Sequence, residues 1–335
     1  MNRGQIAEKK GQKKIKGQIM IMVGLWMTVL LMFAALTIEI GRLLIVKNEL
    51  QNAADSAALQ GASYLYPSTN QPNWSLAQSK ALSAIPNNKV EKVILSNGII
   101  TTGYWNLTTA NMKSDTSTPI AGVVPAVRVT ISKSAGNNGG PVNLYFGLLL
   151  GMPSVNLSAT AVAVSGSPTG VNANELFPIA MAKSLYDTYW DSSNNKPKID
   201  PLTGNPYIFQ INSGPQGGWT SFLEQLNDTP SIRKLVSDGN PTPLSIGQKI
   251  YFSPGVKTEV YSHVPSNKDV FVAITSDTTP GSFGPIVAFG ALHIDFAAGG
   301  SSKYIQVQFT TNLKIPSGEP GGPSYGLYTP ARLAN

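Results

Sequence analysis

The stretch Gly17–Leu65 reads GQIMIMVGLWMTVLLMFAALTIEIGRLLIVKNELQNAADSAALQGASYL and decides the fold of this chain. Its first part, residues 18–38, holds 21 residues without a charged side chain, and as a helix these span ~31 Å, the thickness of a bilayer's hydrocarbon core. After Glu39, small and apolar residues recur every three or four positions, which is the period of one helical face. They are Leu43, Val46, Leu50, Ala53, Ala57, Gly61 and Tyr64. Because no proline occurs before Pro67, we predict one continuous helix, with a transmembrane part at 18–38 and an extracytoplasmic extension at 39–65.

Positive charge is concentrated at the N-terminus. The formal net charge is +7, and residues 1–17 hold six lysines and arginines against one glutamate, which is five of those seven charges. Short basic segments beside a membrane span stay in the cytoplasm. We therefore predict a basic cytoplasmic segment at 1–17, with the bulk of the chain on the outer side of the cytoplasmic (inner) membrane. Little positive charge is left for a folded surface, so we predict no nucleic-acid partner.

A cleaved secretory signal is the alternative interpretation of the N-terminus. The uncharged run is longer than the ~7–15 residues of a signal's apolar region, and no clear A-x-A cleavage site follows it. Charged residues make up only 13% of the chain against ~25% in ordinary soluble proteins, a composition typical of extracytoplasmic β-rich domains. The chain has no cysteine, which excludes disulfides, a thiolate nucleophile and cysteine-ligated zinc.

We predict an α+β head at 66–164, in which an antiparallel sheet covers the small-residue stripe of the long helix. A short helix is expected at Asn73–Ile85, ended by Pro86. The expected strands are Val90–Leu95, Gly98–Asn106, Val127–Ser132 and Val155–Thr160. The first two flank Ser96-Asn97-Gly98, a hairpin signal because Asn-Gly accepts positive φ. The apolar run Pro141–Pro153 is too short to span a bilayer, and we interpret it as a buried connector beneath the sheet.

The remainder predicts a linker at 165–174, a β-rich second domain at 175–315 and a Pro/Gly-rich tail without regular structure at 316–335. Phe177–Lys183 and five later segments have strand character: Lys249–Phe252, Thr258–Ser262, Val270–Thr275, Ile286–Phe296 and Tyr304–Thr311. Ser221 and Glu224 match a capping box that would open a short helix. Thr229 and Pro230 suit the start of another helix, which Gly239 would close.

No catalytic or metal-binding motif stands out. His293 and Asp295 would share one face of a strand, and a hydrogen-bonded surface pair explains them better than catalysis. The oxygen-rich segment Asp191–Asn195, followed by Asp200 and Asn205, lacks the Gly and Glu positions of an EF-hand, so we expect a solvated loop rather than a Ca²⁺ site. We therefore predict no enzyme activity, no catalytic residue, no metal and no cofactor. Glu39 could pair with Arg42 one turn along the helix.

Two segments resemble one family. Residues 17–62 are similar to the N-terminal module of TadE/TadG-like proteins of the Flp (Tad) pilus system: a Gly-Gln pair, an apolar span, an acid near a Gly-Arg-Leu step, and an LQNAADSAALQGA run. Residues 125–133 and 142–163 likewise resemble the sheet of TadG-like proteins. The resemblance implies roles in anchoring and assembly for Gly17, Gln18, Glu39, Gly41, Arg42, Leu50, Asn52, Ala53, Ala54, Asp55, Ala57, Ala58 and Gly61.

A prepilin-type cleavage after Gly17 would place Met22, not the glutamate of pilins, at the fifth mature position. From the resemblance, the apolar span and the lack of a catalytic motif, we expect a membrane-anchored, non-enzymatic component of pilus assembly or secretion machinery. Its partners would be membrane lipid and other pilus subunits, reached through the N-terminal helix. Two alternatives remain, a minor pilin or adhesin-like module at a pilus tip and a membrane-tethered hydrolase.

Overall fold

The computed structural model describes residues 12–67, 71–114, 122–212, 216–255, 258–276 and 278–334. It divides into two compact units, each described by itself. Unit 1 comprises residues up to 53 together with 86–97 and 131–159, and unit 2 comprises 54–85, 98–130 and 160–335. Most of the predicted basic segment, residues 1–11, lies outside the described residues.

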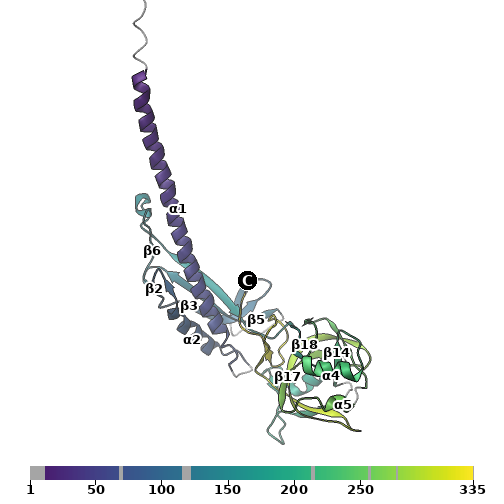
Figure 1. The fold of residues 1–335 in the computed structure, drawn as a ribbon. Coiled ribbons are helices and arrows are strands. Elements are labelled where there is room, and N and C mark those ends of the chain that lie inside the picture. Colours follow the sequence, from purple (N-terminus) through teal and green to yellow (C-terminus); the bar gives the residue numbers. More distant parts are fainter. Residues whose placement is uncertain are drawn as a thin grey trace, which may run out of the picture. The chain divides into compact units, whose positions relative to one another are not determined.

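The predicted continuous helix is confirmed. Helix α1, Gln12–Ala62, runs for 51 residues without interruption (Figure 1). It is long and apolar enough to cross a membrane, and its apolar side chains from Ile19 to Ile38 are mostly exposed. Exposure of this kind is unfavourable in water and natural in lipid. The helix ends within three residues of the predicted Leu65.

The small-residue stripe of α1 is buried as predicted. In unit 1, Val46, Leu50 and Ala53 are at most 2% exposed. In unit 2 the burial continues through Ala57 to Gly61. A Cβ on Gly61 would lie 2.9 Å from the Ala77 carbonyl oxygen and 3.0 Å from Cγ1 of Val127, so only glycine allows this approach.

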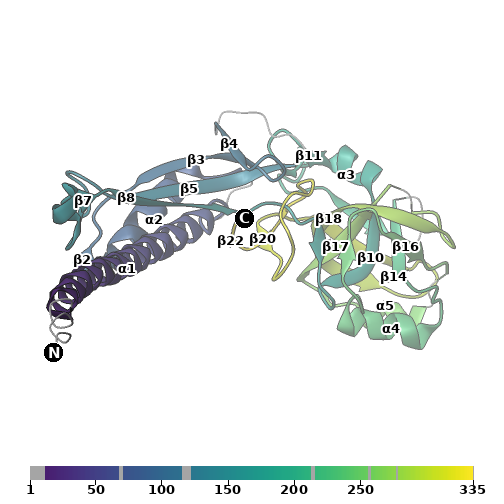
Figure 2. The ribbon, with the colours of Figure 1, turned by 90° about the horizontal axis from the view of Figure 1, so that it is seen from above.

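In unit 2, the end of α1 lies against an antiparallel sheet of five strands in the order β22-β8-β5-β3-β4 (Figure 2). The strands are β22 (Arg332–Leu333), β8 (Leu157–Val164), β5 (Val123–Lys133), β3 (Ile99–Asn106) and β4 (Asn111–Ser114). The predicted short helix is α2, Trp74–Ala84, whose N-cap Asn73 accepts a hydrogen bond from the backbone of Leu76. A 3₁₀ turn, η1 (Ile85–Asn87), follows it. The α+β class of the N-terminal region is thus confirmed.

The predicted hairpin at Ser96-Asn97-Gly98 is wrong. Strands β1 (Lys89–Val90) and β2 (Val93–Ile94) pair with each other instead, across a turn at Glu91 and Lys92 with φ of 50° and 66°. The Asn138 side chain explains the difference, because its oxygen accepts the backbone N–H groups of Ser96 and Asn97 and its amide donates to two carbonyls. A side chain about forty residues away therefore satisfies the backbone that a tight turn would have used.

The expectation of a buried connector at Pro141–Pro153 is also wrong. Strands β6 (Val142–Asn143) and β7 (Ser154–Val155) form a hairpin around the 3₁₀ turn η2 (Gly147–Leu150). Tyr145 and Leu148 are 69% and 72% exposed. The sequence pattern identifies an apolar segment, but apolar side chains do not specify whether protein or another apolar phase covers them.

The second sheet, in unit 2, has seven strands in the order β13-β19-β18-β16-β14-β10-β17. They are β13 (Ile208–Ile211), β19 (Tyr304–Phe309), β18 (Phe283–Ala298), β16 (Lys249–Phe252), β14 (Gly217–Phe222), β10 (Leu176–Ala182) and β17 (Lys268–Thr275). Because β17 pairs with both β10 and β18, five of these strands close into a ring around a core that includes Trp219, Phe252 and Phe289. The predicted second β-rich region is confirmed.

Shorter elements surround this sheet. They are β9 (Gly170–Val171), α3 (Lys183–Tyr189), β11 (Trp190–Asp191), β12 (Lys196–Pro197), α4 (Thr229–Asp238), β15 (Leu244–Ser245), α5 (Thr258–Tyr261), β20 (Leu313–Lys314) and β21 (Leu327–Tyr328). The expected strand at Thr258–Ser262 is instead the helix α5. The capping box is also wrong, because Ser221 lies in β14 and its hydroxyl donates to the Glu224 carbonyl. Helix α4 ends before Gly239 as predicted, but its N-cap is Asp228.

The described C-terminal residues, 316–334, hold more regular structure than their Pro/Gly content predicts. Strand β22 pairs with β8 and so adds an edge to the five-stranded sheet. In the predicted linker, Ser165 is buried and donates to the Thr329 carbonyl, while Thr169 donates to that of Glu319. Strand β22 itself holds neither proline nor glycine, the residues that are depleted in strands, so the Pro/Gly content of the tail does not prevent this pairing.

Candidate functional site

Glu39 is the first charged residue after the apolar span, and it is buried, with 6% exposure. It precedes Leu43 and Val46 by four and seven residues, so it continues the buried stripe of α1. Its Oε2 accepts a hydrogen bond from the backbone N–H of Phe146, at 2.9 Å. A carboxylate on the buried face is thus held by the hairpin between β6 and β7.

Arg42 joins the helix to two other segments of unit 1. Its guanidinium lies 3.4 Å from Oε1 of Glu39 and contacts Oε1 of Glu91. It also donates to the Asn143 carbonyl and lies over the Tyr145 ring, 4.3 Å from the ring centre. A planar guanidinium with several donors can serve these acceptors at once, which a lysine ammonium cannot. The predicted Glu39–Arg42 pair is present.

Glu91 lies in the β1–β2 turn and is shared by two cations. Its other oxygen, Oε2, is 3.0 Å from the Nζ of Lys133, which is only 3% exposed at the end of β5. The backbone N–H of Glu91 donates to the carboxylate of Glu49, about two turns beyond Arg42 on α1. Burial alone would raise the pKa of Glu91, but hydrogen bonds from Lys133 and Arg42 lower it below its ordinary value.

We call Glu39, Arg42, Glu91 and Lys133 the charged cluster. It contains two carboxylates and two cations, so its charges compensate one another in a partly buried place. Four segments meet there: α1, the β1–β2 turn, β5 and the β6–β7 hairpin. Removing one member leaves a partner without its counter-charge, which costs more than the pair itself contributes. The cluster can therefore fix these segments in place.

Sequence reasoning missed Glu91, Lys133 and the hairpin's part in the cluster. A signal for Lys133 was present, because the alternation of β5 places it on the buried face with Val129 and Ile131. A lysine at a buried position needs a carboxylate partner. Which carboxylate it meets depends on the position of the β1–β2 turn, and that turn was assigned wrongly.

The other predicted anchor and assembly residues occupy different environments on α1. Leu50, Ala53, Ala54, Ala57 and Ala58 are fully buried, and Gly61 makes the close approach described above. Gly41 and Asn52 are exposed, and Asp55 is half-buried. Gly17 and Gln18 lie in the helical backbone. The charged cluster brings together only Glu39 and Arg42 of this set.

The second sheet carries the histidine pair considered for catalysis. His293 Nδ1 is 2.7 Å from Asp269 and its Nε2 is 3.9 Å from Asp295, across the adjacent strands β17 and β18. Gln306 and Gln308 donate to Asp295. The group is a hydrogen-bonded row on the sheet surface, as the simpler interpretation predicted.

The loop considered for Ca²⁺ is organised by its own hydrogen bonds. Asp191 accepts from the backbone of Ser193 and Asn194 and from the Asn194 side chain, and these bonds lower the pKa of Asp191. Asn195 donates to Ser324 and Tyr328. Within the described part of the chain, no group of His, Asp and Glu is arranged to hold a metal.

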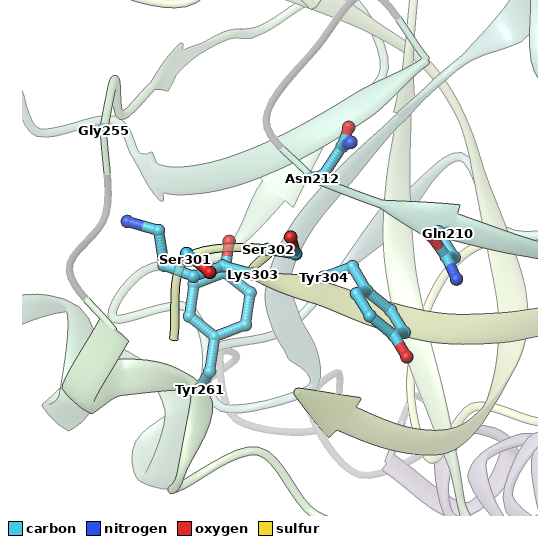
Figure 3. A pocket seen from close by; sticks show the side chains of 8 residues that line it. All are labelled: Gln210, Asn212, Gly255, Tyr261, Ser301, Ser302, Lys303 and Tyr304. Carbon is cyan, nitrogen blue, oxygen red and sulfur yellow. The ribbon is translucent and has the colours of Figure 1, made fainter. Parts of the chain in front are cut away.

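Unit 2 also has a polar pocket of about 400 Å³ beside α5 and β19 (Figure 3). Its lining residues are Gln210, Asn212, Gly255, Tyr261, Ser301, Ser302, Lys303 and Tyr304. Amide, hydroxyl and aromatic groups of this kind can hydrogen-bond and stack on a polar ring-shaped ligand.

Residues 17–63 match the family described as putative Flp pilus-assembly TadE/G-like, and residues 51–163 match the family described as putative Tad-like Flp pilus-assembly. Together the two matches cover residues 17–163, a little under half of the chain, and this N-terminal part is TadE/TadG-like, as in proteins of the Flp (Tad) pilus assembly system. The matches overlap in the LQNAADSAALQGA run and include α1 from Gly17 onward, Glu91, Lys133 and the β6–β7 hairpin. Neither the curated proteins nor the solved structures searched contain a match to the chain.

The TadE/TadG-like match confirms the resemblance on which the functional prediction rests. It places the chain in pilus assembly, and families of this system are generally non-enzymatic structural components. The apolar first half of α1 indicates membrane anchoring within such a system. The seven-stranded sheet lies outside the matched residues.

Proposed function

We propose that this TadE/TadG-like protein is a non-enzymatic, single-pass component of Flp pilus assembly or secretion machinery. Residues 18–38 anchor it in the cytoplasmic membrane with the N-terminus inside, and its sheets lie on the outer side. Its direct partners are other pilus-assembly or pilin-like subunits. The observation that carries the proposal is the charged cluster, which holds four segments together where the apolar span ends.

The proposed mechanism is mechanical. The small side chains of α1 are used by the chain itself, since Gly61 contacts α2 and β5, and Ala54, Ala57 and Ala58 are fully buried. They are therefore closed to partner helices. The exposed face of α1 remains for other subunits, and it includes Ile40, Leu44 and Ile45, each at least 50% exposed. Apolar side chains on one helical face can pack against a second helix in or near the membrane.

The test is complementation of a deletion strain with Glu39→Ala. The variant removes the acceptor of the Phe146 amide and one partner of Arg42, so we expect pilus production to fall while the amount of membrane-bound protein stays unchanged. Glu224→Ala changes an exposed glutamate and is the control, with normal pili expected. Normal pili with Glu39→Ala would remove the charged cluster from the proposal.

A pilus-tip subunit or adhesin is the second candidate function, and the polar pocket of Figure 3 favours it. Shearing the fibres from cells separates the two candidates. A machinery component stays with the membrane fraction and co-purifies with other assembly proteins, whereas a tip subunit leaves with the sheared fibres. Recovery of most of the protein with the fibres would replace the first candidate with the second.

A further inference from the structure

The β6–β7 hairpin has an apolar, exposed tip. Tyr145, Leu148 and Met152 are 69%, 72% and 56% exposed, and Phe146 is 38% exposed. Residues 142–155 contain no Asp, Glu, Lys or Arg. Four large, exposed apolar side chains on one short loop are unfavourably solvated by water.

The tip lies beside the end of the membrane span. The Phe146 amide is bonded to Glu39, the residue that follows the uncharged run, and the Asn143 carbonyl is bonded to Arg42, one turn further from the membrane. From Asn143 to Phe146 the hairpin therefore runs along α1 towards the span, and η2 continues from there. Figure 1 shows this tip beyond the label β6, beside α1.

The backbone of the tip is also hydrogen-bonded internally at several positions. The N–H of Leu144 donates to the Pro153 carbonyl, that of Met152 to Gly147, and that of Gly151 to Leu148. A Cβ on Gly147 would lie 2.2 Å from the Met152 carbonyl oxygen, so the loop is tightly folded. Apolar surroundings accept backbone only when its polar groups are bonded internally, and this loop meets that condition at these positions.

We propose that the tip of the β6–β7 hairpin inserts into the membrane interface next to α1, as a second contact with lipid. The occupant of the apolar surface is the leaflet on the side of the head. Continuity with the span supports this choice, as do Leu36 and Ile38, which are 48% and 61% exposed on the turn of α1 just before Glu39. Tyr145 is suited to the interface because its ring is apolar and its hydroxyl reaches water. The charged cluster then holds the hairpin at the depth where it meets lipid.

This inference rests on the membrane span of the proposed function, and one experiment distinguishes the two. The chain has no cysteine, so single-cysteine variants of the full chain can be labelled with the fluorophore NBD in nanodiscs. The labelled positions are Leu148→Cys at the tip, Leu30→Cys inside the span, and Leu202→Cys as control, the last being 92% exposed in a polar loop. Lipids carrying a nitroxide near the headgroup or deep in the chain act as quenchers.

We expect the label at position 148 to lose most of its fluorescence with the shallow quencher and less with the deep one. The label at position 30 should respond more to the deep quencher, and that at position 202 to neither. If position 148 behaves like position 202 while position 30 is quenched, the insertion of the hairpin is refuted and the span stands. If position 30 is not quenched, the span itself fails. Apart from the scaffold belt, the nanodisc holds only lipid and this chain, so a tip that is shielded in cells but not in nanodiscs contacts a pilus or other cellular protein, which also refutes the proposal.

Discussion

Gly61→Ala tests whether the close approach of α1 to its sheet stabilises the head. On an open helix this change gains ~1 kcal/mol, because alanine forms helices better than glycine. At position 61 the added Cβ would meet the Ala77 carbonyl oxygen and the Ala81 Cβ at 2.9 Å each and the Val127 side chain at 3.0 Å. Overpacking of this kind costs ~1–3 kcal/mol, and a backbone oxygen cannot move cheaply. The net expectation is a loss of ~1 kcal/mol, or ~2–4 °C in melting temperature.

The matched control is Gly41→Ala, on the same helix. A Cβ at Gly41 would meet nothing within 4 Å, so the helix-propensity gain of up to ~1 kcal/mol should appear undiminished. The assay is thermal unfolding of the full chain in detergent micelles, followed by near-ultraviolet circular dichroism. The two substitutions should shift the melting temperature in opposite directions. If Gly61→Ala stabilises the protein as much as Gly41→Ala does, the close-packing argument is wrong.

Three further predictions concern buried polar groups. Asn138→Ala should lower the free energy of unfolding by ~2–4 kcal/mol, measured by denaturant titration, because it leaves several backbone groups unpaired; Asn138→Gly keeps the positive φ and should lose less. The pKa of Glu91 is lowered in the folded protein, so its ion pairs contribute fully to folding stability above pH 4.5, the ordinary pKa of a glutamate. This contribution is lost as the pH falls through the folded-state pKa, and Glu91→Gln should reduce the acid dependence of the melting temperature. Burial raises the pKa of Tyr328 to about 12, so the contribution of its protonated hydroxyl to folding stability is complete below the ordinary value of 10.0 and is lost as the pH rises towards 12. In a titration followed by phenolate absorbance, Tyr328→Phe should remove one group that ionises late.

Much of the N-terminal fold could be predicted because its determinants are local in sequence. The span and the stripe of α1 each follow from residue type and helical period, and the strand β5 follows from an alternation of buried and exposed residues. The helix α2 follows from its cap and a proline. These patterns also carried the resemblance to the TadE/TadG-like family.

The errors arose where distant side chains decide the backbone. Asn138 satisfies the groups of Ser96 and Asn97, and so displaces the hairpin turn to Glu91 and Lys92. Strand β22 forms because β8 presents a free edge, which no pattern within residues 316–335 indicates. The β6–β7 hairpin was assigned to the core because its apolar residues fit either protein or lipid. The local periodicity of the sequence gives no information about long-range hydrogen bonds, or about whether protein or lipid surrounds an apolar side chain.

The position of Glu39 links these observations. It occupies a buried stripe position that an apolar residue would fill at no electrostatic cost, and desolvating a carboxylate is unfavourable unless its oxygens are bonded. Its two oxygens are bonded to groups from two directions, Arg42 on its own helix and the Phe146 amide of the hairpin. With a leucine at this position, the apolar stripe would continue into the span. The hairpin could then pack at several positions along α1, since apolar contacts are not directional. Hydrogen bonds to a carboxylate fix one register. Glu39 is thus best explained as the residue that sets where the head meets the end of the span.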